Sequence, residues 1–127
     1  MAVIPGTRNF KTWAGFYDFA VDGGGTGTIT LRSNDGPIPI GSVILDGYLD
    51  VTTACLSATG TIALQAEAAA DLLAATAQAG LTLGRKSIIP AGTGATAVKT
   101  TADRQPAMVI ATAAFTAGAF TLVLEYR

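Results

Sequence analysis

The amino-acid sequence predicts an all-β protein: an antiparallel, jelly-roll-like β-sandwich with an extended N-terminal arm and at most one short helix. Apolar and polar residues alternate with a period of two in roughly seven or eight short segments, separated by turn signals rich in Gly, Pro, Asn and Asp. There is no strand–helix–strand rhythm and no internal repeat. At 127 residues the chain has the length of one domain. We divide it into an arm with a Gly-rich hinge, residues 1–25, and a single sandwich domain, residues 26–127.

The last strand, within residues 116–127, has the clearest alternation. Four of its side chains point to one face, Phe120, Leu122, Leu124 and Tyr126, and four point to the other, Thr121, Val123, Glu125 and Arg127. The longest candidate strand covers residues 42–55. Its alternation places one set of side chains on one side, Val43, Leu45, Leu49 and Val51. The other set lies on the opposite side, Ile44, Asp46, Tyr48 and Asp50.

Four further segments read as strands: residues 27–32, 60–66, 96–101 and 106–115. In the first of them, Ile29 and Leu31 should point inward. A turn is expected at residues 33–37 and a Gly-rich loop at 80–95. Residues 67–79 are ambiguous, because their composition favours a helix while a β-rich neighbourhood favours a strand.

Five of the nine aromatic residues gather in the segment 10–19: Phe10, Trp13, Phe16, Tyr17 and Phe19. They read either as a first strand with a packed edge or as an arm whose aromatics anchor on another chain, since aromatics dominate interface hot spots. The glycines at 23–27 read as a hinge and favour the arm. A carbohydrate-binding aromatic platform is a third reading.

Composition limits the partners. Only 13% of the residues are charged, about half the usual share, so we expect an oligomer or assembled component; a monomer with a Thr- and Ala-rich surface is the alternative. Net charge is −1 without a basic stripe, which argues against nucleic acid. No apolar run reaches the ~20 residues of a membrane span. The N-terminal residues lack the pattern of a secretory signal, so we expect synthesis in the cytoplasm.

The chain has no histidine and a single cysteine, Cys55. Ser-His-Asp and Cys-His catalysis, histidine metal sites, cysteine-rich zinc sites and an intrachain disulfide are therefore excluded. Cys55 lies in a predicted strand and is expected to be a buried apolar residue. We expect neither a metal nor a cofactor, and no enzymatic activity. Residues 92–97 match a dinucleotide-binding pattern only loosely, since a strand rather than a helix follows them.

Two sets of charged residues lead to separate expectations. Asp46 and Asp50 lie four residues apart on one strand face, ~13 Å along the strand. That separation exceeds the about 5–10 Å between the carboxyl groups of a glycosidase, so they should face solvent or another subunit. Lys99, Asp103 and Arg104 cluster around a turn at 101–105, where they either pair locally or contact a neighbouring subunit.

Several blocks of sequence carry a family resemblance. They are YDFAVDGGG (17–25) leading into TITLR (28–32), GSVILDGYLDVTTAC (41–55), DLLAA (71–75), GTGATAVKTTADRQ (92–105) and TAGAFTLVLEYR (116–127). Their order resembles that of a widespread family of small tailed-phage virion proteins, encoded near the major capsid gene and proposed to decorate the head. A proline-containing lead-in at 38–40 precedes the long strand, as in those relatives. The resemblance contains no catalytic motif.

The resemblance implies a decoration, or cement, protein on the outer capsid surface of a virion, with the major capsid protein as partner and a homotrimer at local three-fold positions. The expected contacts with the capsid or a neighbouring subunit are Phe10, Trp13, Phe16, Tyr17, Phe19, Lys99, Asp103 and Arg104. The alternative is a tail- or fibre-associated module that binds a host-surface glycan, although the few Asn and Gln residues count against it.

Overall fold

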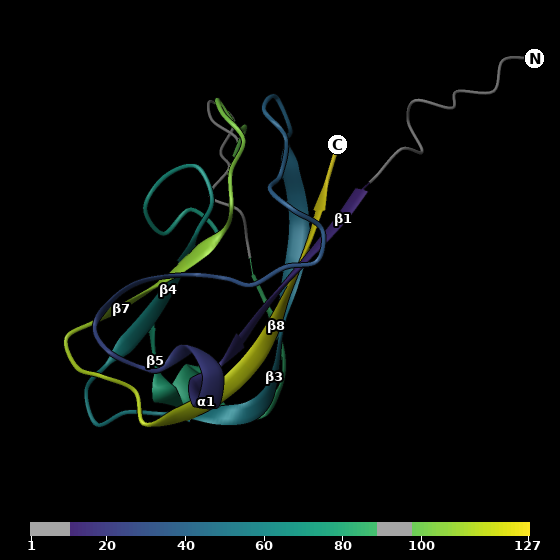
Figure 1. Cartoon of the computed structure of the whole chain (residues 1–127). Coiled ribbons are helices and arrows are strands. Elements are labelled where there is room, and N and C mark those ends of the chain that lie inside the picture. Colours follow the sequence, from purple (N-terminus) through teal and green to yellow (C-terminus); the bar gives the residue numbers. More distant parts are fainter. Residues whose placement is uncertain (1–10, 89–97) are drawn as a thin grey trace, which may run out of the picture.

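A computed structural model describes residues 11–88 and 98–127, which fold into two four-stranded antiparallel sheets packed as a sandwich (Figure 1). The strands of the first sheet are, in spatial order, β1 (Lys11–Asp18), β8 (Ala117–Tyr126), β3 (Ile44–Leu56) and β6 (Gly84–Ser87). Those of the second are β2 (Gly27–Thr30), β7 (Ala107–Ala111), β4 (Thr61–Gln65) and β5 (Leu73–Ala77). The predicted all-β sandwich is confirmed.

The strands pair in a nested order. The first strand pairs with the last, the second with the seventh, the third with the sixth and the fourth with the fifth. This jelly-roll-like order brings every connection between strands to one of the two ends of the sandwich. Segments far apart in sequence therefore lie side by side at each end.

The last strand lies inside its sheet, between β1 and β3. Phe120, Leu122 and Leu124 are buried in the core and Tyr126 packs partly against it, so the face that these four side chains were predicted to share is the inward one. A central strand with one buried face must hold its alternation to its last residue, since a slip of one residue would expose the whole face.

The predicted division of β3 into two faces is only partly correct. Leu49 and Val51 share the buried face, but Leu45, expected on the same side, is 43% exposed, and Ile44, expected on the other side, is 3% exposed. The pairing of β3 with β8 shifts between Ile44 and Asp46, which marks a β-bulge. A bulge inserts one residue and so exchanges the two faces of the strand beyond it.

The aromatic segment forms a strand of the sandwich instead of an arm across residues 11–18. β1 is paired with β8 along its whole length. Trp13 and Tyr17 are buried; the Trp13 indole donates to the Gly36 carbonyl at 2.7 Å and the Tyr17 hydroxyl to the Gly23 carbonyl at 2.6 Å. Burial raises the pKa of Tyr17 to about 12. Residues 11–18, which were expected to belong to an arm ending at residue 25, are thus part of the sandwich, because Trp13 and Tyr17 are buried in its core.

The glycines after this strand follow a single turn of helix, α1 (Phe19–Asp22). Gly23 has a φ of 77° directly after α1, a conformation that glycine adopts without strain. A Cβ on Gly24 would lie 2.2 Å from the Phe115 carbonyl oxygen. Gly23 therefore allows the chain to turn at the end of α1, and Gly24 allows the close backbone contact with Phe115.

The ambiguous segment 67–79 is a turn followed by a strand. β5 pairs with β4, and a short 3-10 turn, η2 (Gln78–Gly80), follows it. The buried Asp71 carboxylate accepts hydrogen bonds from the backbone N–H groups of Ala66, Glu67 and Ala68 and so fixes the turn. Pairing with β4 overrides the helical composition of the segment.

Two further predictions need correction. The expected loop 80–95 contains β6, which completes the first sheet by pairing with β3. The expected strand 96–101 contributes one isolated bridge, between Lys99 and Val43, within the described residues. Residues 1–10, with Phe10, and residues 89–97, with the glycine pattern at 92–97, lie outside the described residues. Cys55 is buried as predicted, and burial raises the pKa of its thiol to about 11.

Candidate interaction surfaces

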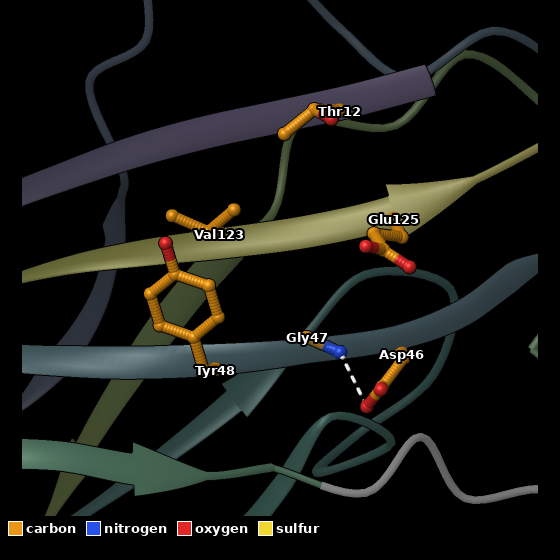
Figure 2. A pocket seen from close by; sticks show the side chains of 6 residues that line it. All are labelled: Thr12, Asp46, Gly47, Tyr48, Val123 and Glu125. Atoms are coloured by element: carbon orange, nitrogen blue, oxygen red, sulfur yellow. Dashed lines mark hydrogen bonds between the residues drawn. The ribbon is translucent and has the colours of Figure 1, made fainter. Parts of the chain in front are cut away.

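The outer face of the first sheet carries a shallow hollow of about 270 Å³ (Figure 2). It is lined by residues from three adjacent strands: Thr12 of β1, Val123 and Glu125 of β8, and Asp46, Gly47 and Tyr48 of β3. All of these residues except Gly47 are the outward members of strands whose other members form the core. The hollow is therefore a product of the alternation along each strand.

The strand register places two carboxylates next to each other in this hollow. Glu125 lies directly opposite Thr12 on one side and Asp46 on the other. One Asp46 carboxylate oxygen accepts from the Gly47 N–H at 2.8 Å. Like charges opposite each other on adjacent strands repel, so the pair opposes folding to a small extent. A Cβ on Gly47 would lie 2.6 Å from the Val123 carbonyl oxygen, which explains the glycine.

An exposed cation covers the aromatic ring beside the hollow. The Arg85 guanidinium carbon lies 4.3 Å from the centroid of the Tyr48 ring, and Arg85 is the register partner of Asp50. Cation–π stacking of this kind contributes ~0.5–1 kcal/mol at an exposed site. One face of Tyr48 is thereby occupied, which leaves less of the ring for stacking on a sugar. Asp46 and Asp50 were predicted to lie on the same face of one strand. Both side chains point to the outer face of the first sheet.

Within residues 11–88 and 98–127, no group of three or more His, Cys, Asp or Glu side chains is arranged to hold a metal ion. In the same ranges, no helix has the length and apolar character needed to cross a bilayer.

The structure separates the three charged residues predicted to act together at 101–105. Arg104 forms an ion pair with Glu67, with 2.8 Å between Nε and Oε1, and the Asp103 carboxylate accepts from the Ile40 N–H at 2.9 Å. Lys99 is exposed, and its backbone bridges to Val43. A subunit contact by Lys99, Asp103 or Arg104 stays a prediction.

The Arg104–Glu67 pair ties the turn before β5 to the segment before β7. Two hydrogen bonds join the guanidinium to the carboxylate, and the Thr101 hydroxyl and N–H donate to the same carboxylate. These hydrogen bonds lower the pKa of Glu67 from 4.5 to about 2, and the one from Arg104 has the largest effect. The pair therefore stabilises the end of the sandwich that carries most of the charge.

The aromatic residues predicted as contacts divide into two groups. Trp13 and Tyr17 are buried in their own chain, so their side chains are not available to another subunit in this conformation. Phe16 is half-buried on the outer side of β1, in register with Thr121, and Phe19 is half-buried against the core at the start of α1. A contact through Phe16 or Phe19 stays a prediction.

A second surface lies at one end of the sandwich, where four connections meet. We call it the loop end and define it by residues 19–26, 57–60, 78–83 and 112–116, with the adjoining Leu56. In Figure 1 it is the lower end, with α1, opposite the C-terminus. The Phe115 N–H donates to the Gly24 carbonyl at 2.8 Å, and the Thr116 N–H donates to the Leu56 carbonyl, also at 2.8 Å. The connections thus form one continuous surface.

Ser57 joins three of these connections. Its hydroxyl donates to the Ala114 carbonyl at 2.8 Å and accepts from the Gly60 N–H at 2.9 Å, while its own N–H donates to the Gln78 side chain at 2.8 Å. Ser57 is buried. A Cβ on Gly60 would lie 2.4 Å from the Ala113 carbonyl oxygen, so the backbones are in close contact.

Sequence reasoning missed this surface, although a signal for it exists. Three long runs contain no charged residue: 51–66, 72–84 and 105–124. Each run centres on one of the connections at the loop end. A count of charges by segment would have marked these runs, but only the topology shows that they meet.

No protein-family model matches the chain, and no curated protein matches it. Solved structures do. A chain of the cyanophage Pam1 capsid asymmetric unit is 22% identical, with a TM-score of 0.61 over 93% of this chain and 84% of that one. A chain of the acid-stable capsid of Helicobacter pylori bacteriophage KHP30 is 11% identical, with a TM-score of 0.62 over 92% and 86%. A chain of the Ralstonia phage GP4 capsid is 18% identical, with a TM-score of 0.64 over 99% and 89%. Likeness at these identities concerns the fold.

Proposed function

We propose that this protein is a structural component of a phage virion that decorates and stabilises the outer surface of the capsid. The observation that carries the proposal is the fold: the sandwich matches, over nearly the whole of both chains, chains found in the capsids of three different phages. The sequence blocks that resemble head-decoration proteins support the same role. Fold alone does not determine function, so the role needs a direct test.

The proposed mechanism is thermodynamic. A protein that binds the expanded shell, and not its separated subunits, adds its binding free energy to the stability of the shell. A homotrimer at a local three-fold position would hold neighbouring capsomers through three footprints, so that weak contacts are strengthened by avidity. The low share of charged residues, 13%, suits a protein that buries much of its surface.

The test is binding of the full chain to empty, expanded heads purified without this protein. Mass by light scattering after size exclusion gives the oligomer, and co-sedimentation gives binding. The proposal predicts a trimer that binds saturably and raises the temperature at which the heads come apart. Absence of binding to heads, together with binding to a panel of host-surface glycans, would replace it with the tail- or fibre-associated role.

A further inference from the structure

We infer that the loop end is the surface that docks on the capsid shell, and that its partner is an uncharged, partly apolar protein surface. The inference rests on the proposed function and deepens it, since it assigns the contact to particular residues. Three large apolar side chains are exposed at this end: Val21 at 67%, Leu83 at 67% and Leu56 at 49%. They come from α1, from the segment before β6 and from the end of β3.

Charge is distributed unequally between the two ends of the sandwich. In the four connections of the loop end the only charged residue is Asp22, and the Arg32 guanidinium pairs with it at 3.0 Å. The Lys86 ammonium also reaches this end, where it donates to the Thr82 hydroxyl at 2.9 Å. The connections at the opposite end carry Asp35, Glu67, Lys99, Asp103 and Arg104. Burial of the loop end would therefore remove few charges from water, whereas burial of the opposite end would remove many.

This distribution fixes the chemistry of the partner. Interface cores are depleted of charged residues, and a charged partner placed against the loop end would meet few unpaired charges, because Asp22 and Arg32 already pair with each other. The matching surface is therefore uncharged, and its contact with Val21, Leu56 and Leu83 should depend weakly on salt. The charged end then faces solvent, which suits a protein on the outside of a shell.

The loop end is also preorganised. The hydrogen bonds of Ser57 and those of the Phe115 and Thr116 N–H groups hold the connections together before any partner binds. Binding then orders little of the backbone, so less of the contact free energy is lost to conformational entropy. Copies that associate through their sides could each present this end to one shell, while end-to-end pairing of two copies would hide it from the shell.

The test compares two substitutions to aspartate with the full chain. Leu83→Asp places a charge in the loop end, and Ile40→Asp places one at the opposite end, where Ile40 is 64% exposed. Both variants are first checked for the wild-type circular dichroism spectrum and mass. We expect Leu83→Asp to lower the affinity for heads by at least about tenfold, because the new charge must be removed from water at the contact. Ile40→Asp should bind like wild type, and wild-type binding should change little between low and high salt.

Each other outcome overturns the inference in a distinguishable way. Wild-type affinity of Leu83→Asp removes the loop end from the shell contact and leaves the proposed function standing. Equal losses in both variants remove the distinction between the ends. Loss of oligomer in Leu83→Asp makes the loop end a contact between copies. Failure of wild type to bind heads ends the proposed function itself. Should Leu83→Asp not fold, Val21→Asp takes its place, since Val21 is also exposed at the loop end.

Discussion

The Ser57 hydroxyl donates a hydrogen bond of 2.8 Å to the Ala114 carbonyl oxygen, and it joins two connections that lie 57 residues apart in sequence. The same hydroxyl accepts from the Gly60 N–H, so one buried oxygen satisfies a backbone acceptor and a backbone donor. The loop end depends on this arrangement, because its connections contain few other side chains able to link them.

Replacement of Ser57 by alanine should therefore lower the free energy of unfolding by ~1–3 kcal/mol, since it leaves the Gly60 N–H without a partner in a buried place and the Ala114 carbonyl without one in a partly buried place. Urea denaturation followed by circular dichroism measures the change. Ser33→Ala is the control, because the Ser33 hydroxyl accepts only an exposed hydrogen bond from the Asp35 N–H. Equal losses in the two variants would contradict the role assigned to Ser57.

Replacement of Gly60 by alanine should destabilise the protein by ~1–3 kcal/mol, because the new Cβ would lie 2.4 Å from the Ala113 carbonyl oxygen and the backbones would have to separate. Gly25→Ala is the matched control, since a Cβ there meets nothing within 4 Å. Thermal unfolding of both variants distinguishes them. A Gly60→Ala protein as stable as Gly25→Ala would show that the connections are not in close contact.

The Arg104–Glu67 pair predicts an acid-dependent loss of stability. The folded protein lowers the pKa of Glu67 from 4.5 to about 2, with the hydrogen bond from Arg104 as the first cause. A lowered folded-state pKa contributes stability that is complete above pH 4.5 and is lost as the pH falls toward 2. The difference in unfolding free energy between wild type and Glu67→Gln should shrink over this interval. A difference that stays constant from neutral pH to pH 2 would contradict the pairing.

The opposed carboxylates of Asp46 and Glu125 predict a stabilising substitution. Glu125→Gln removes one of two like charges on adjacent strands and should raise the free energy of unfolding by ~0.2–1 kcal/mol at low salt, with a smaller gain at high salt. Asp50→Asn is the control, because Asp50 lies opposite Arg85 and its loss should give no gain. Denaturant titration at two salt concentrations measures the change in the free energy of unfolding for both variants. A gain for Asp50→Asn equal to that for Glu125→Gln would argue against repulsion as the cause.

Alternation along the chain predicts the sandwich because most strands bury one face. β8 shows this most clearly, since Phe120, Leu122 and Leu124 all fill the core. The bulge in β3 was not predictable in the same way, because Ile44 and Leu45 are similarly apolar and only the pairing with β8 decides which one is buried. The aromatic strand β1 was placed in an arm because the glycines after it resemble a hinge. Their structural reasons, the end of α1 and a close contact with Phe115, are tertiary.

The candidate site was less predictable than the fold. The contact residues proposed from sequence include Trp13 and Tyr17, which are buried in the core of their own chain. The loop end instead carries Val21, Leu56 and Leu83, which are far apart in sequence and come to the same end of the sandwich only through the nested strand order. Hydrophobic patterning identifies what is buried within a chain, but it does not identify which exposed apolar side chains will share one surface.

The central claim is that the protein binds the outside of a capsid shell, and the most direct measurement is its co-sedimentation with expanded heads that lack it. The proposed role predicts saturable binding to the heads, no binding to separated capsid subunits, and a higher temperature of head disruption at saturation. Heads that sediment without the protein, at concentrations where the protein is folded and soluble, would contradict it.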